Sequence, residues 1–140
     1  MASLQEEIED KVIDCIALGS GGRLVAFKPE NPDKDLVVEK RADYAKKKIS
    51  FDIFRIDRPT QEALAKHING LVTAQSIKEE NDFYLLFLSF DIVSQKLGDN
   101  FWVIPSKELK DIANSELSSF SLKKDGLPGF ILEKIEDKKL

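Results

Sequence analysis

The chain is poor in the residues that build disulfide frameworks and zinc sites, because its 140 residues include one cysteine and one histidine. Cys15 alone cannot form an intramolecular disulfide, and His67 alone excludes most zinc sites, which combine several such ligands. No apolar run approaches the roughly 18 residues that a membrane-spanning helix needs. The first ten residues are acidic and lack the basic and apolar regions of a signal peptide. From these absences we expect a cytoplasmic protein that does not enter a membrane.

The composition is that of an ordinary globular protein. Hydrophobic residues make up 42% of the chain and charged residues 33%, and a length of this order is typical of one domain of roughly 100–200 residues. We therefore expect a single domain over residues 1–140. The net charge of −4, from 21 basic and 25 acidic residues, argues against a strong non-specific nucleic-acid binder.

Hydrophobic periodicity predicts a helix followed by three strands. Apolar residues recur at helical spacing over residues 4–18, and Ser3 and Glu6 have the spacing of a capping box, in which each side chain accepts a hydrogen bond from a backbone amide of the first turn. Strand-like runs, bounded by proline and turn residues, then occupy residues 23–28, 35–40 and 49–57.

The second half of the chain continues the alternation of helices and strands. Pro59 opens a helical segment, and the apolar run 83–92 has the length of a strand that is buried on both faces. Further strands are predicted at 101–104 and 117–122, and further helices at 106–114 and 130–139. The order predicts a mixed α/β fold, with a sheet of four to six strands flanked by helices.

The glycine-rich and nucleophile motifs of common enzymes are missing. The sequence has no G-x-x-x-x-G-K-[ST], no G-x-G-x-x-G and no G-x-S-x-G. Residues 20–22 (SGG) follow a helix, so we interpret them as its C-terminal cap and not as a phosphate-binding loop. Cys15 lies on the apolar stripe of the first helix, which is typical of a buried structural thiol.

Two aspartates are brought together if residues 35–41 and 48–57 form an antiparallel hairpin. Facing residues then have numbers that sum to about 87, which places Asp35 opposite Asp52. Two facing carboxylates are tolerated when they are solvated, when one is protonated, or when a divalent cation bridges them. The other interpretation remains open: Asp35 belongs to a turn, and Asp52 lies on a solvated strand face.

Five segments follow the first helix in an order that carries a family resemblance. They read RLVAFKP, DKDLVVEKR, ISFDIFR, FYLLFLSF and FWVIPSKEL. Over roughly residues 5 to 122 the chain resembles small restriction-endonuclease-like proteins of the PD-(D/E)xK nuclease superfamily. The resemblance implies an αβββαβ core and a catalytic pair, Asp35 and Asp52, that holds Mg²⁺ or Mn²⁺. Glu9 is the nearest acidic residue on the first helix and is the implied third metal ligand.

The chain departs from this family at the position of the catalytic lysine. The family pattern has a lysine two residues after the second acid, where this chain has Phe54. Alternation places residues 52 and 54 on one face of a strand, so a lysine there would stabilise the attacking hydroxide and the phosphate charge. Either another lysine, such as Lys28 or Lys34, reaches the site, or the nuclease-like fold has lost catalysis. We favour the second interpretation.

A basic segment next to the aspartates suggests a contact with DNA. Residues 41–58 contain six basic and three acidic groups, and we expect Lys46, Lys47 and Lys48 to contact phosphates. The competing interpretation is a solvated loop that protects a sheet edge from aggregation. The sequence therefore indicates a nuclease-fold protein that acts on or binds DNA, with degenerate metal-dependent hydrolysis. The alternative is a non-enzymatic module that binds a protein partner or forms a homodimer.

Overall fold

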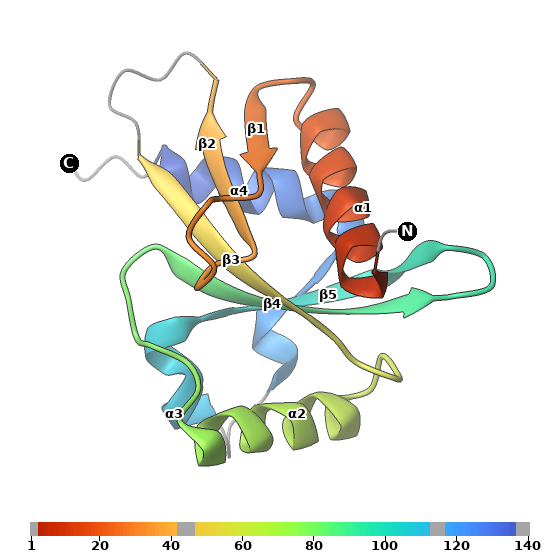
Figure 1. Ribbon diagram of the computed structural model, residues 1–140, viewed down its shortest axis with the longest axis vertical. Coiled ribbons are helices and arrows are strands. Elements are labelled where there is room, and N and C mark those ends of the chain that lie inside the picture. The colour runs from red at the N-terminus through yellow and green to blue at the C-terminus, as the bar shows by residue number, and fades with distance from the viewer. Residues whose placement is uncertain (1–2, 42–46, 113–116, 137–140) are drawn as a thin grey trace.

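The computed structural model describes residues 3–41, 47–112 and 117–136, which form one mixed sheet with helices on both faces (Figure 1). The helices are α1 (Leu4–Gly19), α2 (Gln61–Ala74), α3 (Leu109–Ile112) and α4 (Leu127–Ile135). The strands are β1 (Leu24–Phe27), β2 (Leu36–Lys40), β3 (Lys48–Arg55), β4 (Phe83–Asp91), β5 (Lys96–Pro105) and β6 (Ser121–Lys123). Three short 3₁₀ helices are η1 (Ser106–Glu108), η2 (Leu117–Phe120) and η3 (Lys124–Gly126).

The six strands are hydrogen-bonded in sequence order, from β1 at one edge to β6 at the other. Only β3 and β4 run parallel, and the other neighbouring pairs are antiparallel. A parallel pair needs a crossover connection, and α2 supplies it. The predicted mixed α/β class, with its order of helix, three strands, helix and strand, is confirmed.

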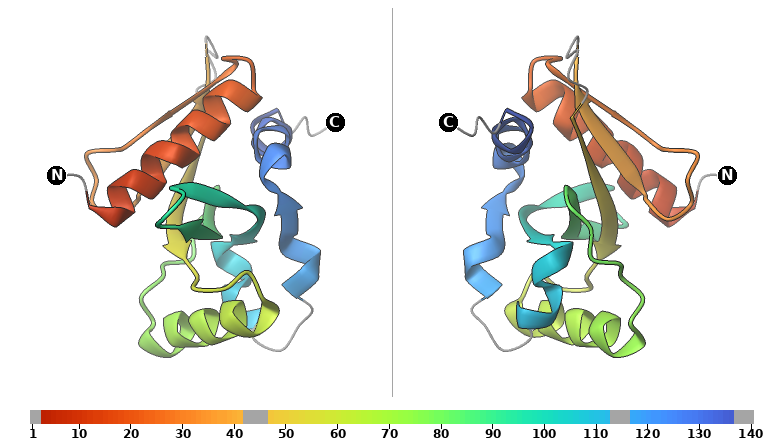
Figure 2. Two further views of the ribbon diagram at one scale, coloured as in Figure 1. Left: turned by 90° about the vertical axis from the view of Figure 1, so that its right-hand side faces the viewer. Right: turned by 90° about the vertical axis from the view of Figure 1, so that its left-hand side faces the viewer.

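One face of the sheet is covered by α1 and α4. The Ser3 hydroxyl accepts a hydrogen bond from the Glu6 amide (3.1 Å) and so caps α1, as the sequence predicted. The apolar stripe of α1 and the residues Leu127, Ile131 and Ile135 of α4 then pack against alternate residues of β2 to β5. Figure 2 shows α1 and α4 apart from each other, and the residues of this apolar core lie between these helices and the sheet.

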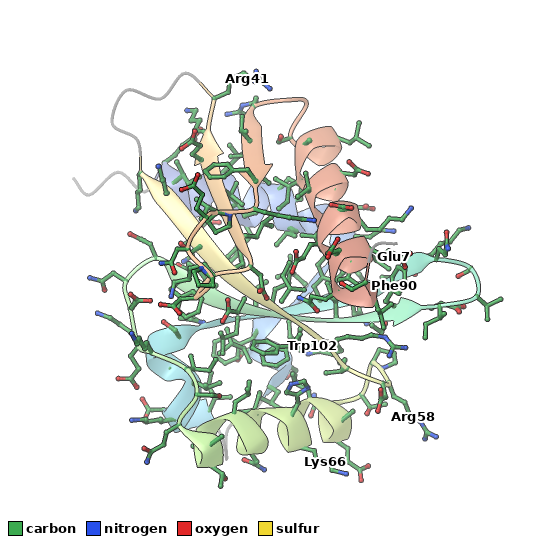
Figure 3. All side chains as sticks on the ribbon, in the orientation of Figure 1. Glu7, Arg41, Arg58, Lys66, Phe90 and Trp102 are labelled. Atoms are coloured by element: carbon green, nitrogen blue, oxygen red, sulfur yellow. The ribbon has the colours of Figure 1, made fainter. Side chains whose placement is uncertain are left out.

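The opposite face is covered by α2 and α3. Leu64 and Ile68 of α2 pack with Leu109 and Ile112 against β4 and β5. Trp102 of β5 lies in this second core, between the sheet and α2 (Figure 3). Since β4 is buried on both sides, its sequence is almost continuously apolar, which matches the predicted central strand.

The ends of several elements differ from the sequence-based expectation. Strand β5 begins at Lys96, five residues before the predicted start, because it forms a long hairpin with β4 (Figure 1). Most of the predicted strand 117–122 is the 3₁₀ helix η2, and within this segment only residues 121 and 122, which belong to β6, pair with β5. Helix α4 begins at Leu127 and not at residue 130, since Pro128 fits the first turn of a helix. The predicted end of this helix, at residues 137–139, lies outside the described residues.

Two helical glycines should respond in opposite ways to alanine. A Cβ atom at Gly19 would lie 2.6 Å from Cγ of Pro128, whereas one at Gly70 meets no atom within 4 Å. We expect Gly19→Ala to lower the free energy of unfolding by about 1–3 kcal/mol through overpacking. Gly70→Ala should raise it by about 0.5–1 kcal/mol, because alanine is the better helix former. Urea denaturation of the two variants checks both signs, and a stabilising Gly19→Ala would contradict the close packing of α1 on α4.

Candidate metal and catalytic site

The aspartates Asp35 and Asp52 lie side by side at the start of the β2–β3 hairpin. Strand pairing gives Leu36 the partner Phe51, so the predicted register, in which residue numbers sum to 87, is confirmed. The Asp35 amide lies 3.0 Å from the Phe51 carbonyl oxygen and 3.2 Å from Oδ1 of Asp52. The Ile53 amide donates to Oδ2 of Asp35 (2.8 Å). Backbone amides therefore hold the two carboxylates next to each other.

Helix α1 brings Glu9 to the same group of residues through Gln5. Nε2 of Gln5 donates to Oε2 of Glu9 (3.0 Å) and to Oδ2 of Asp35 (3.3 Å), and it also reaches the carbonyl oxygen of Ile53 (3.2 Å). The sequence analysis missed Gln5, although its position four residues before Glu9 places both side chains on one face of a helix. Glu9 is only 8% exposed, which is unusual for a glutamate.

Burial makes all three carboxyl groups harder to ionise, and the negative charge of Asp35 adds to the effect at Asp52 and Glu9. Burial raises the pKa of Asp52 to about 6, and the neighbouring Asp35 carboxylate adds to the rise. Burial also raises the pKa of Asp35, against the opposing effect of its hydrogen bond from Ile53. The pKa of Glu9 is raised by burial as well, and the Gln5 hydrogen bond counteracts the rise. This cluster therefore carries negative charge at a cost that a bound cation would reduce.

The two lysines that could replace the family lysine lie near different carboxylates. Nζ of Lys28 is 3.8 Å from Oε1 of Glu9 and 3.0 Å from Oδ1 of Asp10. Lys34 lines a small cavity of about 80 Å³ together with Asp52, and its positive charge counteracts the rise in the Asp52 pKa.

Lys34 is itself held by other groups. Its ammonium forms an ion pair with Glu80 and lies 3.7 Å from the centroid of the Phe83 ring. With these contacts its side chain is only 14% exposed. Of Lys28 and Lys34, only Lys34 therefore lies beside Asp52, in a cavity that Lys78 also lines, and Lys34 is already paired with Glu80.

Phe54 belongs to the apolar core under α2. Its ring stacks on Phe87, with centroids 5.2 Å apart, and meets the edge of the His67 ring at 5.3 Å. Burial lowers the pKa of His67, which is consistent with a neutral imidazole in this aromatic group. The position of the family lysine is therefore filled by a residue that anchors the crossover helix to the sheet.

The predicted DNA-contacting lysines are paired with acidic groups where they are described. Nζ of Lys47 lies 3.9 Å from Oδ1 of Asp82, and Nζ of Lys48 lies 3.7 Å from Oε2 of Glu39. Exposed pairs of this kind contribute about 0–1 kcal/mol and are screened by salt, so both lysines can exchange these partners for phosphates. Lys46, the third predicted contact, lies outside the described residues.

The carboxylates of Asp35 and Asp52 are suitable ligands for a hard cation that takes two ligands from the protein. Within the described residues, Oδ1 of Asp35 and Oδ2 of Asp52 accept no hydrogen bond, while the other oxygen of each group does. Mg²⁺ is commonly bound by one or two carboxylates, waters and phosphate oxygens. Across the ranges 3–41, 47–112 and 117–136, however, no three Asp, Glu, His or Cys side chains are grouped so that they could hold a metal. The arrangement thus offers a carboxylate pair and does not place Glu9 as a third ligand.

Comparisons with known proteins leave the site to be interpreted from its geometry. No protein-family model, curated protein or solved structure matches this chain. The resemblance to PD-(D/E)xK nucleases therefore depends on the short motifs around Asp35 and Asp52. In the part of the chain that the structure describes, no helix is long and apolar enough to cross a membrane.

The raised pKa of Asp52 predicts a stabilising substitution at neutral pH. Its pKa rises from the ordinary value of 3.8 to about 6, so the folded state holds this proton more tightly than the unfolded chain. The free energy of unfolding should therefore fall as the pH rises between these values. Asp52→Asn, which keeps an oxygen that can accept from the Asp35 amide, removes this loss. We expect it to raise the free energy of unfolding by about 1 kcal/mol above pH 7, a figure that allows for solvent screening.

Urea denaturation of both proteins in the presence of a chelator, across the acidic and neutral range, measures this difference. The two proteins should converge below about pH 3, where Asp52 is protonated in both the folded and the unfolded state. An Asp52→Asn variant that is less stable than the wild type at neutral pH would show that the ionised Asp52 carboxylate does not destabilise the folded state.

Proposed function

We propose that this chain is a nuclease-like protein that binds DNA beside a divalent cation, Mg²⁺ or Mn²⁺, held by Asp35 and Asp52. The observation that carries the proposal is the hydrogen-bonded pair of half-buried carboxylates, each with one oxygen that no described residue contacts through a hydrogen bond. Such a pair is costly without a cation, because burial opposes ionisation of both groups and the charge of Asp35 further opposes ionisation of Asp52. The motifs DKDLVV and ISFDIF, which resemble the metal-binding motifs of PD-(D/E)xK nucleases, support the proposal that Asp35 and Asp52 bind the cation.

The chain's own residues prepare this site before any ligand binds. The amides of Asp35 and Ile53 fix one oxygen of each carboxylate, so the remaining oxygens are held without a further loss of side-chain entropy. Gln5 restrains the Asp35 carboxylate from the side of α1. A bound divalent metal would supply Lewis-acid polarisation of a phosphate and a more acidic water.

Hydrolysis should be weak, because the chain lacks a free lysine at the expected position. Phe54 cannot stabilise a hydroxide or a phosphate oxygen, and it is packed against Phe87. Lys34 lies beside Asp52, yet its ammonium group already forms an ion pair with Glu80. We therefore propose DNA binding as the main activity, with residual metal-dependent phosphodiester hydrolysis.

Calorimetric titration with Mn²⁺ tests the metal site without any knowledge of the DNA substrate. We expect one site in the wild type, weakened by at least about tenfold in Asp52→Asn and in Asp35→Asn, because each loses a charged oxygen ligand. Asp99→Asn, an exposed aspartate on β5, is the matched control and should bind like the wild type. Equal heats in all four proteins would reject the carboxylate pair as a metal site.

The DNA contact is tested by the salt dependence of binding to a labelled duplex, followed by fluorescence anisotropy. The double variant Lys47→Gln/Lys48→Gln should reduce the slope of log K against log salt by about 2 between about 50 and about 200 mM salt, if each lysine contacts one phosphate. Lys107→Gln/Lys110→Gln, two exposed lysines on η1 and α3, provides the control. An unchanged slope in the first variant would place DNA binding elsewhere or exclude it.

Self-association is a second candidate function, favoured by the tip of the β4–β5 hairpin. Ile92 and Val93 are 58% and 94% exposed there, and the hairpin projects from the body of the protein (Figure 1). Exposed apolar side chains next to each other are typical of a contact surface. Sedimentation equilibrium should detect a dimer that Ile92→Ser/Val93→Ser dissociates. A wild-type chain that is monomeric throughout would reject this second function and leave the first untouched.

A further inference from the structure

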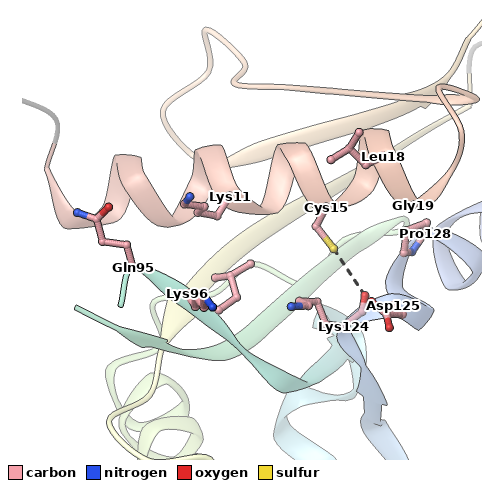
Figure 4. A pocket seen from close by; sticks show the side chains of 10 residues that line it. Lys11, Cys15, Leu18, Gly19, Gln95, Lys96, Lys124, Asp125 and Pro128 are labelled. Atoms are coloured by element: carbon pink, nitrogen blue, oxygen red, sulfur yellow. Dashed lines mark hydrogen bonds between the residues drawn. The ribbon is translucent and has the colours of Figure 1, made fainter. Parts of the chain in front are cut away.

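A second concave site lies on the opposite half of α1 from Gln5 and Glu9. It is a cavity of about 750 Å³ between the C-terminal half of α1, the start of β5 and the segment that leads into α4 (Figure 4). Its volume falls in the range of small-molecule sites, about 300–1,000 Å³. None of the residues Glu9, Asp35, Asp52 or Lys34 lines it, so it is separate from the carboxylate pair.

The charge of this cavity is positive, in a chain whose net charge is −4. Lys11 comes from α1, Lys96 from β5 and Lys124 from η3, so three separate elements each contribute one ammonium group (Figure 4). Among the described residues, none of these three lysines has a carboxylate oxygen within 4 Å, unlike Lys28 and Lys34 near the candidate metal site. Asp125 is the single acidic residue of the lining, which leaves an excess of two positive charges.

Besides Gln95, the remaining lining is mostly apolar. Leu18 is 82% exposed at the edge of the cavity, and Leu97 and Pro128 contribute further apolar surface. Gly19 lets α1 approach Pro128 so closely that a Cβ atom would lie 2.6 Å from the proline ring. Both residues line the cavity, so this close contact fixes part of its wall.

Cys15 also lines the cavity, but its thiol is unreactive. Its Sγ donates to the carbonyl oxygen of Lys124 at 3.6 Å, as Figure 4 shows. Burial raises the pKa of this thiol, so at neutral pH it is protonated. The thiol therefore ties η3 to α1, and so fixes the backbone of Lys124, but does not act as a nucleophile.

From these features we propose that the cavity binds a small organic anion, namely a carboxylate or phosphate monoester attached to an apolar group. The three ammonium groups would neutralise the anion, and the surface formed by Leu18, Leu97 and Pro128 would cover its apolar part. Three lysines present flexible point charges and not the planar fork of arginine, so carboxylate and phosphate headgroups are both compatible. An uncharged apolar molecule would form no ion pair with the lysines and should bind much more weakly than the anion.

The binding of anilinonaphthalene sulfonate, an aromatic anion whose fluorescence rises in apolar surroundings, tests the proposal directly. We expect saturable binding by the full chain, with Kd raised at least about tenfold in Lys96→Gln/Lys124→Gln, since two of the three positive charges are lost. The control pair Lys107→Gln/Lys110→Gln should keep the wild-type Kd. Leu18→Asp, which adds a negative charge at an exposed position, should also weaken binding. Thermal denaturation of each variant verifies that it is folded.

Displacement of the probe distinguishes the headgroups. Octanoate and octyl phosphate should displace it and octanol should not; the stronger of the two anions identifies the preferred headgroup. The proposal is overturned if the lysine variants bind the probe as tightly as the wild type, or if octanol displaces it as well as the anions do. Absence of saturable binding by the wild type would also overturn it. None of these three results depends on metal or DNA binding, so the proposed function is tested independently.

Discussion

The parallel pairing of β3 with β4 is the constraint on which the rest of the structure depends. It forces the chain to cross over the sheet through α2, and the register places Phe54 beside Phe87. The two rings and His67 then form the aromatic contact between sheet and crossover helix. The residue that departs from the nuclease pattern is therefore explained by packing, because the face that carries Asp52 also has to hold α2.

The candidate site combines two opposing electrostatic effects. Backbone amides from the β2–β3 hairpin stabilise the ionised forms of Asp35 and Asp52, while burial destabilises both and the charge of Asp35 also destabilises that of Asp52. For Asp52 the destabilising effects prevail, since its pKa rises to about 6. Ionising this cluster destabilises the folded state, and the cation proposed above would reduce that cost.

Helix α1 connects the two sites proposed for this protein. Its first half places Gln5 and Glu9 next to Asp35, and its second half forms one wall of the basic cavity. The apolar stripe between them is buried against the sheet, which fixes both groups relative to the same rigid element. A ligand in the cavity would contact the helix without contacting the carboxylates.

The sequence by itself determined the local features of this protein. It predicted the Ser3 cap, the mixed α/β class and the hairpin register that pairs Asp35 with Asp52, because caps, alternation and turn positions depend on residues close in the chain. Only the tertiary structure decided which lysine lies beside Asp52, that Gln5 links Glu9 to Asp35, and that three distant lysines line one cavity. The cavity joins residues of α1, β5 and η3, and the proximity of Lys34 to Asp52 joins a loop to the sheet. The distances between these residues are set by the packing of elements far apart in the chain, which periodicity does not reveal.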